Sequence, residues 1–216
     1  MKVYCSWSGG KDSALALYNA HQEGNRLDGL FTITTEEGPS RSHRIPESVL
    51  CRQGELMGLN WQGSPASWES YEQVFLKNLK EFKEQGIQGM VFGDIDLDEH
   101  REWNDSVCHQ TGLKALHPLW QQDEEKLLQE FIDLGFKALI VCVKYEDLSV
   151  DWLGRELSQE TVEQLKNMDL SPAGEGGEYH TLVVDGPLFS ERLEICQLGT
   201  SFKDDTGHAF LDYRLK

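Results

Sequence analysis

Residues 8 to 13, Ser-Gly-Gly-Lys-Asp-Ser, combine side chains and backbone freedom that suit anion binding. They follow a short apolar run and open a helical pattern, so free backbone N–H groups and the positive end of a helix dipole would face an anion. The glycines allow close approach, and the hydroxyl groups and the lysine add donors. We predict that a polyphosphate binds to Ser8, Gly9, Gly10, Lys11, Asp12 and Ser13.

This turn differs from the Walker A loop, which would need glycine in place of Cys5 and a hydroxyl residue in place of Asp12. A carboxylate inside an anion site is understandable if a divalent cation bridges it to the phosphates. We therefore predict that Asp12 binds Mg²⁺. The alternative is a simple turn in which Asp12 and Ser13 only cap the helix.

A second segment with chemical potential is Gly-Glu-Gly-Gly-Glu-Tyr-His, at residues 174 to 180. It joins a flexible backbone to two carboxylates and an imidazole, which can bind a cation or an amine and can supply acid or base groups. Taken by itself, the segment is also compatible with a turn whose glutamates are solvated.

A scaffold for both segments is indicated by short apolar runs that alternate with helical patterns ended by glycine, an arrangement typical of α/β proteins. Strands are expected at 3–7, 30–34, 59–62, 90–92, 115–119 and 136–143, and helices at 12–23, 46–57, 71–82, around 103–108 and at 127–132. The last strand is apolar at nearly every position, which indicates cover on both faces.

From about residue 145 the pattern changes to a polar helix, a glycine-rich loop and hairpin-like segments. We expect a doubly wound, mainly parallel α/β sheet over 1–145 and a small C-terminal α+β subdomain over 146–216. In doubly wound sheets, ligands bind beyond the carboxyl ends of strands. Thr34, Gly93 and Asp94 fall at such ends and are predicted to line an adenosine site, the alternative being ordinary loop polarity.

The composition restricts the class of protein. The 216 residues carry 37 acidic and 20 basic side chains, a net charge of −17, which disfavours a broad nucleic-acid surface. No apolar run approaches the roughly 18 to 20 residues of a membrane helix, and no signal peptide is visible. The five cysteines are dispersed and form no C-x-x-C pair. We expect a cytoplasmic protein without membrane contact.

The chemical segments carry a resemblance. Residues 8–13 are similar to the PP-loop, S-G-G-x-D-S, of the N-type ATP pyrophosphatases, and 174–181 resemble the G-E-[NG]-G-E-[FY]-[HE]-T stretch of the diphthine-ammonia ligase family. Phe92-Gly93-Asp94-Ile95, Arg101, Val107-Cys108 and Pro118-Leu119-Trp120 recur in the family's order. Gly176 stands where eukaryotic members usually have Asn, and their long C-terminal extension does not follow, as in the short archaeal and bacterial form.

The resemblance implies an adenine nucleotide alpha hydrolase-like, HUP-type fold and an ATP-dependent ligase. Such an enzyme adenylates a carboxylate, releases pyrophosphate and forms an amide with ammonia, here in the last step of diphthamide synthesis on elongation factor 2. ATP and Mg²⁺ would be required, with ammonium and the elongation factor as partners. A carboxylate must be activated because oxide is a poor leaving group, whereas AMP leaves readily.

The resemblance also implies residue roles. Lys11 and Asp12 would stabilise charge on pyrophosphate, and Glu178 or His180 would orient or deprotonate ammonia. Substrate binding is assigned to His43, Arg101, Glu175, Gly177 and Glu178. Unaided by the resemblance, His43 would be an exposed loop residue and Arg101 a partner in a surface salt bridge.

Two other functions stay open. Other PP-loop proteins modify tRNA, although neither a basic surface nor a cysteine pair is evident here. A nucleotide-binding protein without ligase activity is the second alternative, and the 174–180 segment weighs against it. The oligomeric state is left open, with a homodimer among the outcomes.

Overall fold

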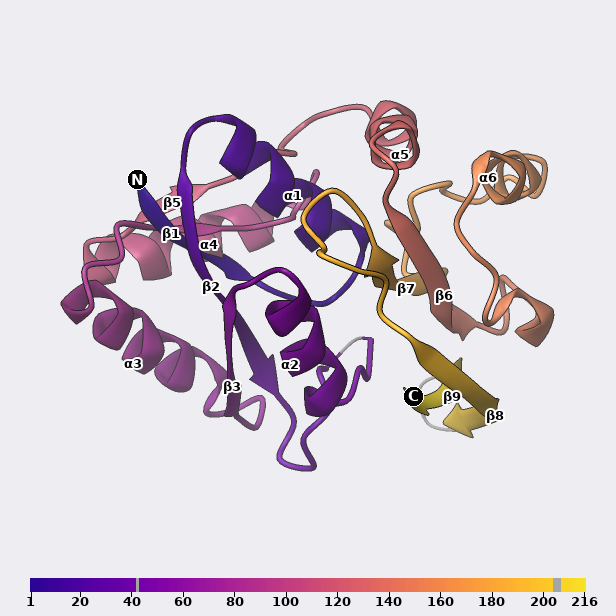
Figure 1. Cartoon of the computed structure of the whole chain (residues 1–216), viewed down its shortest axis with the longest axis horizontal. Coiled ribbons are helices and arrows are strands. Elements are labelled where there is room, and N and C mark those ends of the chain that lie inside the picture. The colour runs from indigo at the N-terminus through magenta and orange to yellow at the C-terminus, as the bar shows by residue number, and fades with distance from the viewer. Residues whose placement is uncertain (42, 204–206) are drawn as a thin grey trace.

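A parallel sheet of five strands forms the first part of the computed structural model, which describes residues 1–41, 43–203 and 207–216 (Figure 1). The sheet order is β3-β2-β1-β4-β5, so the strand order reverses between β1 and β4. Its members are β1 (Lys2–Ser6), β2 (Arg26–Thr34), β3 (Asn60–Pro65), β4 (Gly89–Val91) and β5 (Lys114–Leu116). This reversal is where doubly wound folds bind ligands.

Helices cover both faces of this sheet. Leu17 of α1 (Lys11–Gln22) and Leu50 of α2 (Glu47–Leu56) belong to one buried core. Phe75 of α3 (Tyr71–Glu84) and Val107 of α4 (Asp98–Thr111) belong to a second, smaller core. The doubly wound α/β class is therefore confirmed, and Gly112 ends α4 with a left-handed φ of 69° as its position predicts.

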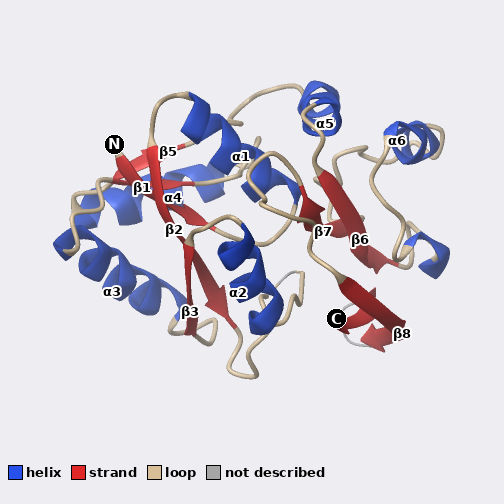
Figure 2. Cartoon of the chain, viewed as in Figure 1, coloured by secondary structure: helices blue, strands red, loops and turns tan. Residues whose placement is uncertain are grey.

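The second part is an antiparallel sheet in the order β7-β6-β9-β8 (Figure 2). Its strands are β6 (Lys137–Lys144), β7 (Tyr179–Asp185), β8 (Ile195–Lys203) and β9 (His208–Leu215). The helices α5 (Glu124–Asp133) and α6 (Gln159–Lys166) and the short 3-10 helix η1 (Val150–Trp152) accompany it. The small C-terminal α+β part is confirmed.

One expected strand belongs to the other sheet. The run at 136–143 was expected to continue the parallel sheet, but β6 pairs antiparallel with β7 and β9. Every residue from 138 to 143 is buried, and a strand covered on both faces has the same apolar sequence whichever way its neighbours run. The predicted domain boundary at residue 145 stays a prediction. Strand β6, which belongs to the second sheet, ends just before that residue.

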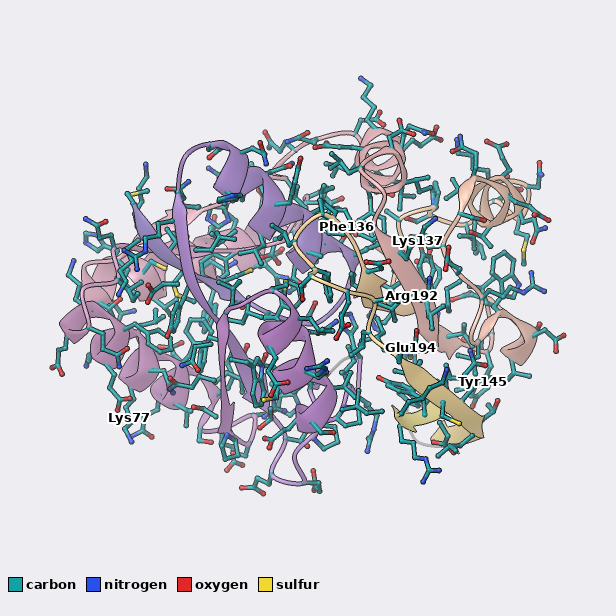
Figure 3. The ribbon with its side chains drawn as sticks, in the orientation of Figure 1. Lys77, Phe136, Lys137, Tyr145, Arg192 and Glu194 are labelled. Atoms are coloured by element: carbon teal, nitrogen blue, oxygen red, sulfur yellow. The ribbon has the colours of Figure 1, made fainter. Side chains whose placement is uncertain are left out.

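The two sheets share one hydrophobic core. α1 contacts β7 and α2 contacts β9, so these helices lie between the sheets (Figure 1). Phe136, at the start of β6, joins the parts, since its ring stacks on Phe131 at 4.8 Å and meets Tyr18 edge-on at 5.9 Å. Lys77 lies at the periphery of the molecule and Phe136 at its centre (Figure 3). The helices within the described ranges all lack the length and apolar character that a membrane span requires.

Candidate active site

The turn at residues 8–13 connects β1 to α1 at the point where the strand order reverses. The Ser8 and Ser13 hydroxyl groups lie 3.1 Å apart, and the backbone N–H of Gly10 donates to Ser8 Oγ. Gly9 has a φ of +83°, and a Cβ there would lie 2.7 Å from Ile45 Cδ1. Only glycine fits this backbone, so the turn keeps its shape through covalent geometry and packing together.

Strand β7 of the second sheet forms hydrogen bonds with this turn. Val183 N–H donates to the carbonyl of Gly9 at 2.9 Å, and Lys11 N–H donates to Thr181 Oγ1 at 3.0 Å. The fully buried Gln53 donates to the same Gly9 carbonyl and to that of Val183, and accepts from Trp7 Nε1. The turn is therefore fixed between α2 and β7 rather than held by its own helix alone.

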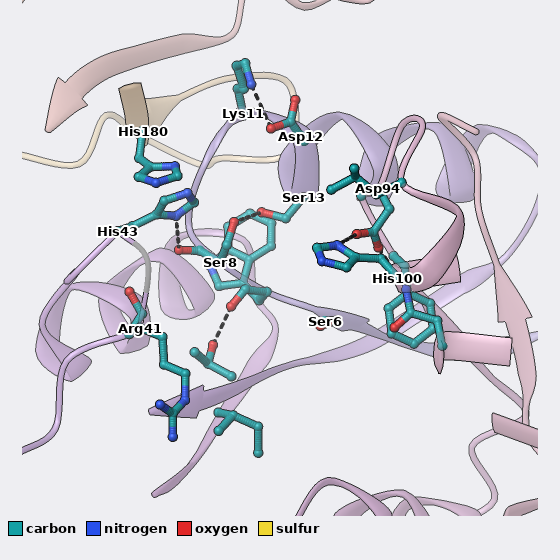
Figure 4. Close-up of a pocket in the computed structure, with 18 of the residues that line it drawn as sticks. Ser6, Ser8, Lys11, Asp12, Ser13, Arg41, His43, Asp94, His100 and His180 are labelled. Atoms are coloured by element: carbon teal, nitrogen blue, oxygen red, sulfur yellow. Dashed lines mark hydrogen bonds and ion pairs between the residues drawn. The ribbon is translucent and has the colours of Figure 1, made fainter. Parts of the chain in front are cut away.

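A cavity of about 560 Å³ opens beside the turn (Figure 4). Its walls come from both parts of the chain, because the parallel sheet supplies the turn and the 174–180 loop supplies the opposite side. An aromatic end of the cavity is formed by rings that contact one another, those of Phe31, Trp68, Tyr71, Phe75 and Trp103. A polar end and an aromatic end in one cavity match the two ends of a nucleotide.

Charged groups gather at the polar end. Lys11 Nζ, almost wholly buried, lies 2.8 Å from Asp12 Oδ2 and 4.0 Å from Glu175 Oε1. Burial raises the pKa of Glu175 to about 7, and the charge of Asp12 acts in the same direction. A carboxyl group of this kind can accept and release a proton near neutral pH.

Two histidines from distant segments also meet there. The rings of His43 and His180 lie 4.6 Å apart, and His43 Nδ1 is 3.1 Å from the carbonyl of Ser8 (Figure 4). Burial lowers the pKa of His43 and holds the pKa of His180 well below its usual value. Both rings are therefore neutral in the free protein at pH 7.

Most of the predicted site residues meet at this cavity. The lining includes Ser8, Lys11, Asp12, Ser13, His43, Gly93, Asp94, Glu175, Gly177 and His180. Gly9 and Gly10 shape the backbone behind the wall. Asp94 is held in place by His100 Nδ1 at 3.0 Å and by Asn104 Nδ2 at 2.8 Å.

Besides Gly9 and Gly10, three predicted site residues stand outside the lining. Thr34 is fully buried and donates its hydroxyl to Glu47 Oε1. Arg101 lies over the ring of Trp120, at 4.7 Å, and 3.7 Å from Asp105. Glu178 turns into its own loop, where Oε1 accepts from Ser171 N–H and Oε2 is buried without a described partner.

Several residues that line the cavity were not among the predicted site residues. The Arg41 guanidinium lies 4.4 Å above the ring of Trp68, beside Tyr71, and donates to the carbonyl of Ala66. The periodic aromatics of α3 predict a buried face, and that pattern does not distinguish a core from a cavity wall. Gln53, which lies behind the turn, had no sequence signal beyond its neighbours.

A divalent cation fits this wall through Asp12. Within the described residues no three His, Cys, Asp or Glu side chains form a metal cluster. Mg²⁺ commonly takes one or two carboxylates and completes its shell with water and substrate phosphates. A partly exposed Asp12 beside the phosphate turn is compatible with that mode of binding.

Comparison with known proteins agrees with this two-part site. Residues 1–115 match the model of the diphthamide synthase N-terminal domain, and residues 123–214 match that of the C-terminal domain. The chain belongs to the diphthamide synthase family. The first match carries the turn at residues 8–13, and the second carries the 174–180 loop, so the diphthamide synthase cavity lies where the two matched regions meet.

Curated relatives extend over most of the chain. A diphthine–ammonia ligase of Bos taurus is 37% identical over 221 residues, 89% of this chain and 82% of the relative. The Homo sapiens protein of that name is 36% identical with the same coverage. The Schizosaccharomyces pombe protein is 29% identical, and there the match spans only 36% of a longer relative. These shares place the similarity across both parts of the diphthamide synthase fold.

Proposed function

We propose that this chain is an ATP-dependent ligase that activates a carboxylate as its adenylate and forms an amide with ammonia. The observation that carries the proposal is the meeting of a clamped phosphate turn with a carboxylate-bearing loop across one cavity. The names of the relatives indicate diphthine on elongation factor 2 as the acceptor. The reaction would take place in the cytoplasm.

In the first step, an oxygen of the acceptor carboxylate attacks the α-phosphorus, and the bond to the bridging oxygen breaks. Lys11 Nζ and the N–H groups of the turn other than those of Gly10 and Lys11 hold the departing pyrophosphate and stabilise its growing charge. Mg²⁺ held by Asp12 would supply further neutralisation of phosphate charge. Gly93 and Asp94, which line the cavity after β4, would hold the adenosine.

In the second step, ammonia attacks the acyl carbon, the bond from that carbon to the AMP oxygen breaks, and the nitrogen releases a second proton to solvent as the neutral amide forms. Ammonium must lose a proton first, and we assign that proton to Glu175. Its carboxylate lines the cavity, whereas Glu178 faces its own loop and His180 packs on His43. We therefore propose that Glu178 shapes the loop and that Gly177 gives it room to approach substrate.

The test is product analysis with purified protein, ATP, Mg²⁺, ammonium and diphthine-bearing elongation factor 2. We expect AMP and pyrophosphate in step with amide formation, quantified by chromatography and mass spectrometry. Formation of ADP, or no turnover with this acceptor, contradicts the proposal. A parallel reaction with tRNA in place of the factor tests the alternative function, and AMP release with tRNA alone would favour it.

A further inference from the structure

His43 and His180 form a pair that the proposed chemistry leaves without a task. His43 comes from the loop before α2 and His180 from β7, and both line the cavity beside the phosphate turn (Figure 4). Among the described residues, the His43 ring bonds to the Ser8 carbonyl and the His180 ring makes no hydrogen bond. Buried or half-buried imidazoles without carboxylate partners have capacity for a ligand.

The pair lies directly against the turn. A Cβ on Gly10 would come within 2.8 Å of His43 Cε1 and 3.1 Å of the Thr181 carbonyl, so His43 packs on the Gly10 backbone. His43 Nε2 is bonded to this same Cε1 atom. A phosphate cradled by the turn would therefore lie close to that nitrogen.

The charged and titratable groups around the pair come from α1 and β9. Lys11 and Asp12 on α1 face His43, with Lys11 opposing its protonation and Asp12 favouring it. His43, Lys11 and His208 on β9 all oppose protonation of His180. Burial is the largest cause that lowers the pKa of each ring, and the free pair is neutral. Arrival of several negative charges at the turn reverses the balance.

We infer that His43 and His180 form a proton-accepting clamp for the terminal phosphates of the nucleotide, which takes up one proton as the nucleotide binds. The inference rests on the proposed function, because it needs a nucleotide on the turn. It gives the two histidines a binding role in place of the activation of ammonia.

The proton balance follows from the hydrogen bond to Ser8. A carbonyl only accepts, so His43 Nδ1 carries the hydrogen and Nε2 has the free lone pair. A proton from solvent adds to Nε2 and converts it into a donor for a phosphate oxygen. His180 stays neutral, because two imidazolium rings 4.6 Å apart would repel each other. The pair therefore accepts about one proton.

Isothermal titration calorimetry tests the uptake. The ligand is the Mg²⁺ complex of α,β-methylene ATP, which has no cleavable bond between its α and β phosphates. The protein is titrated at a pH of about 7 in buffers of different ionisation enthalpy. We expect the binding heat to vary with the buffer, with a slope of about one proton taken up. AMP, which lacks the terminal phosphates, is expected to bind without uptake.

Matched variants locate the proton. His43→Asn keeps an N–H for the Ser8 carbonyl but does not titrate, so it should bind the analogue without proton uptake. His180→Asn removes the neutral partner ring and should keep an uptake of about one proton, because that proton adds to His43 Nε2. His109→Asn, on the exposed face of α4, should retain the parent slope.

The outcomes separate the two proposals. No binding of the analogue by the parent protein contradicts the proposed function. Binding with a heat that is the same in all buffers leaves that function intact and overturns the clamp, whatever the variants do. Uptake that persists in His43→Asn, or that occurs equally with AMP, also overturns it.

Discussion

Two carboxylates at the polar end of the cavity have different chemical roles in the proposed reaction. Lys11 is flanked by Asp12 and Glu175, and these carboxylates have different surroundings. Asp12 is partly exposed at the head of α1, where a cation could reach it. Glu175 is more enclosed, with a pKa raised to about 7 by burial. One carboxylate therefore suits metal binding and the other suits proton transfer.

Replacement of Asp12 by Asn tests the metal assignment. The change removes the carboxylate and with it the expected Mg²⁺ ligand, so AMP release should fall by a factor on the order of 10² or more. The measurement is initial AMP release across a range of Mg²⁺ concentrations. The exposed Asp133→Asn on α5 is the control and should match the parent. Unchanged AMP release in Asp12→Asn would contradict the assignment.

Replacement of Glu175 by Gln tests the base. Amide formation with ammonium should fall by a factor on the order of 10² to 10⁴, because ammonium then keeps its proton. Hydroxylamine, which is neutral near pH 7, should still form hydroxamate. In the parent, the rate with ammonium should decline as the pH falls below about 7, since protonated Glu175 is no base.

Glu178→Gln, in the same loop, is the matched control for Glu175→Gln. Its carboxylate faces Ser171 N–H, so amide formation should remain close to that of the parent. Loss of activity with both nucleophiles in Glu175→Gln would indicate a structural role. A large loss confined to ammonium in Glu178→Gln would return the base to that residue.

Helices and strands position these groups by crossing from one sheet to the other. Gln53 on α2 connects Trp7, the Gly9 carbonyl and the Val183 carbonyl inside the core. Thr181 on β7 receives the N–H of Lys11. The phosphate turn therefore depends on a helix and a strand that are remote in sequence.

Gln53→Leu should show this dependence. The change leaves a buried Trp7 N–H and a buried Val183 carbonyl without that partner, which lowers the free energy of unfolding by about 2–4 kcal/mol. Urea unfolding should give a lower midpoint with an unchanged slope. Gln110→Leu, on the exposed part of α4, is the control. Equal midpoints for the two variants would show that Gln53 does not hold the turn.

The two sheets of the molecule share one core. The free energy of unfolding therefore depends on the protonation of titratable groups buried between the sheets. His43 and His180 have pKa values below those of the unfolded chain. The unfolded state therefore binds protons first as the pH falls below about 6.5, and stability is lost in that range. Glu175 acts oppositely, because its raised pKa makes the folded state bind a proton first.

The double variant His43→Asn/His180→Asn should show a weaker dependence of the free energy of unfolding on pH at acidic pH. We expect the parent to lose stability between a pH of about 6.5 and 5, and the double variant to lose less, because it has no histidine to charge there. Urea midpoints at both pH values measure the difference. A parallel loss in the two proteins would mean that these histidines are not held neutral by the fold.

The sequence by itself determined the turn at residues 8–13, the alternating α/β elements and the glycine-rich loop at 174–180. These features depend on neighbours within a few residues, such as glycines that free the backbone and apolar spacings that set helix faces. The strand at 59–62 was likewise indicated locally, and the structure extends it to Pro65.

Only the tertiary structure decided which side chains face the cavity. Glu175 and Glu178 are three residues apart in one loop, yet one lines the cavity and the other turns away. His43 and His180 meet because β7 joins a sheet that packs on α1, and β6 takes antiparallel partners. Such contacts join residues far apart in the chain, and local patterns carry no information on which long-range packing buries the most apolar surface.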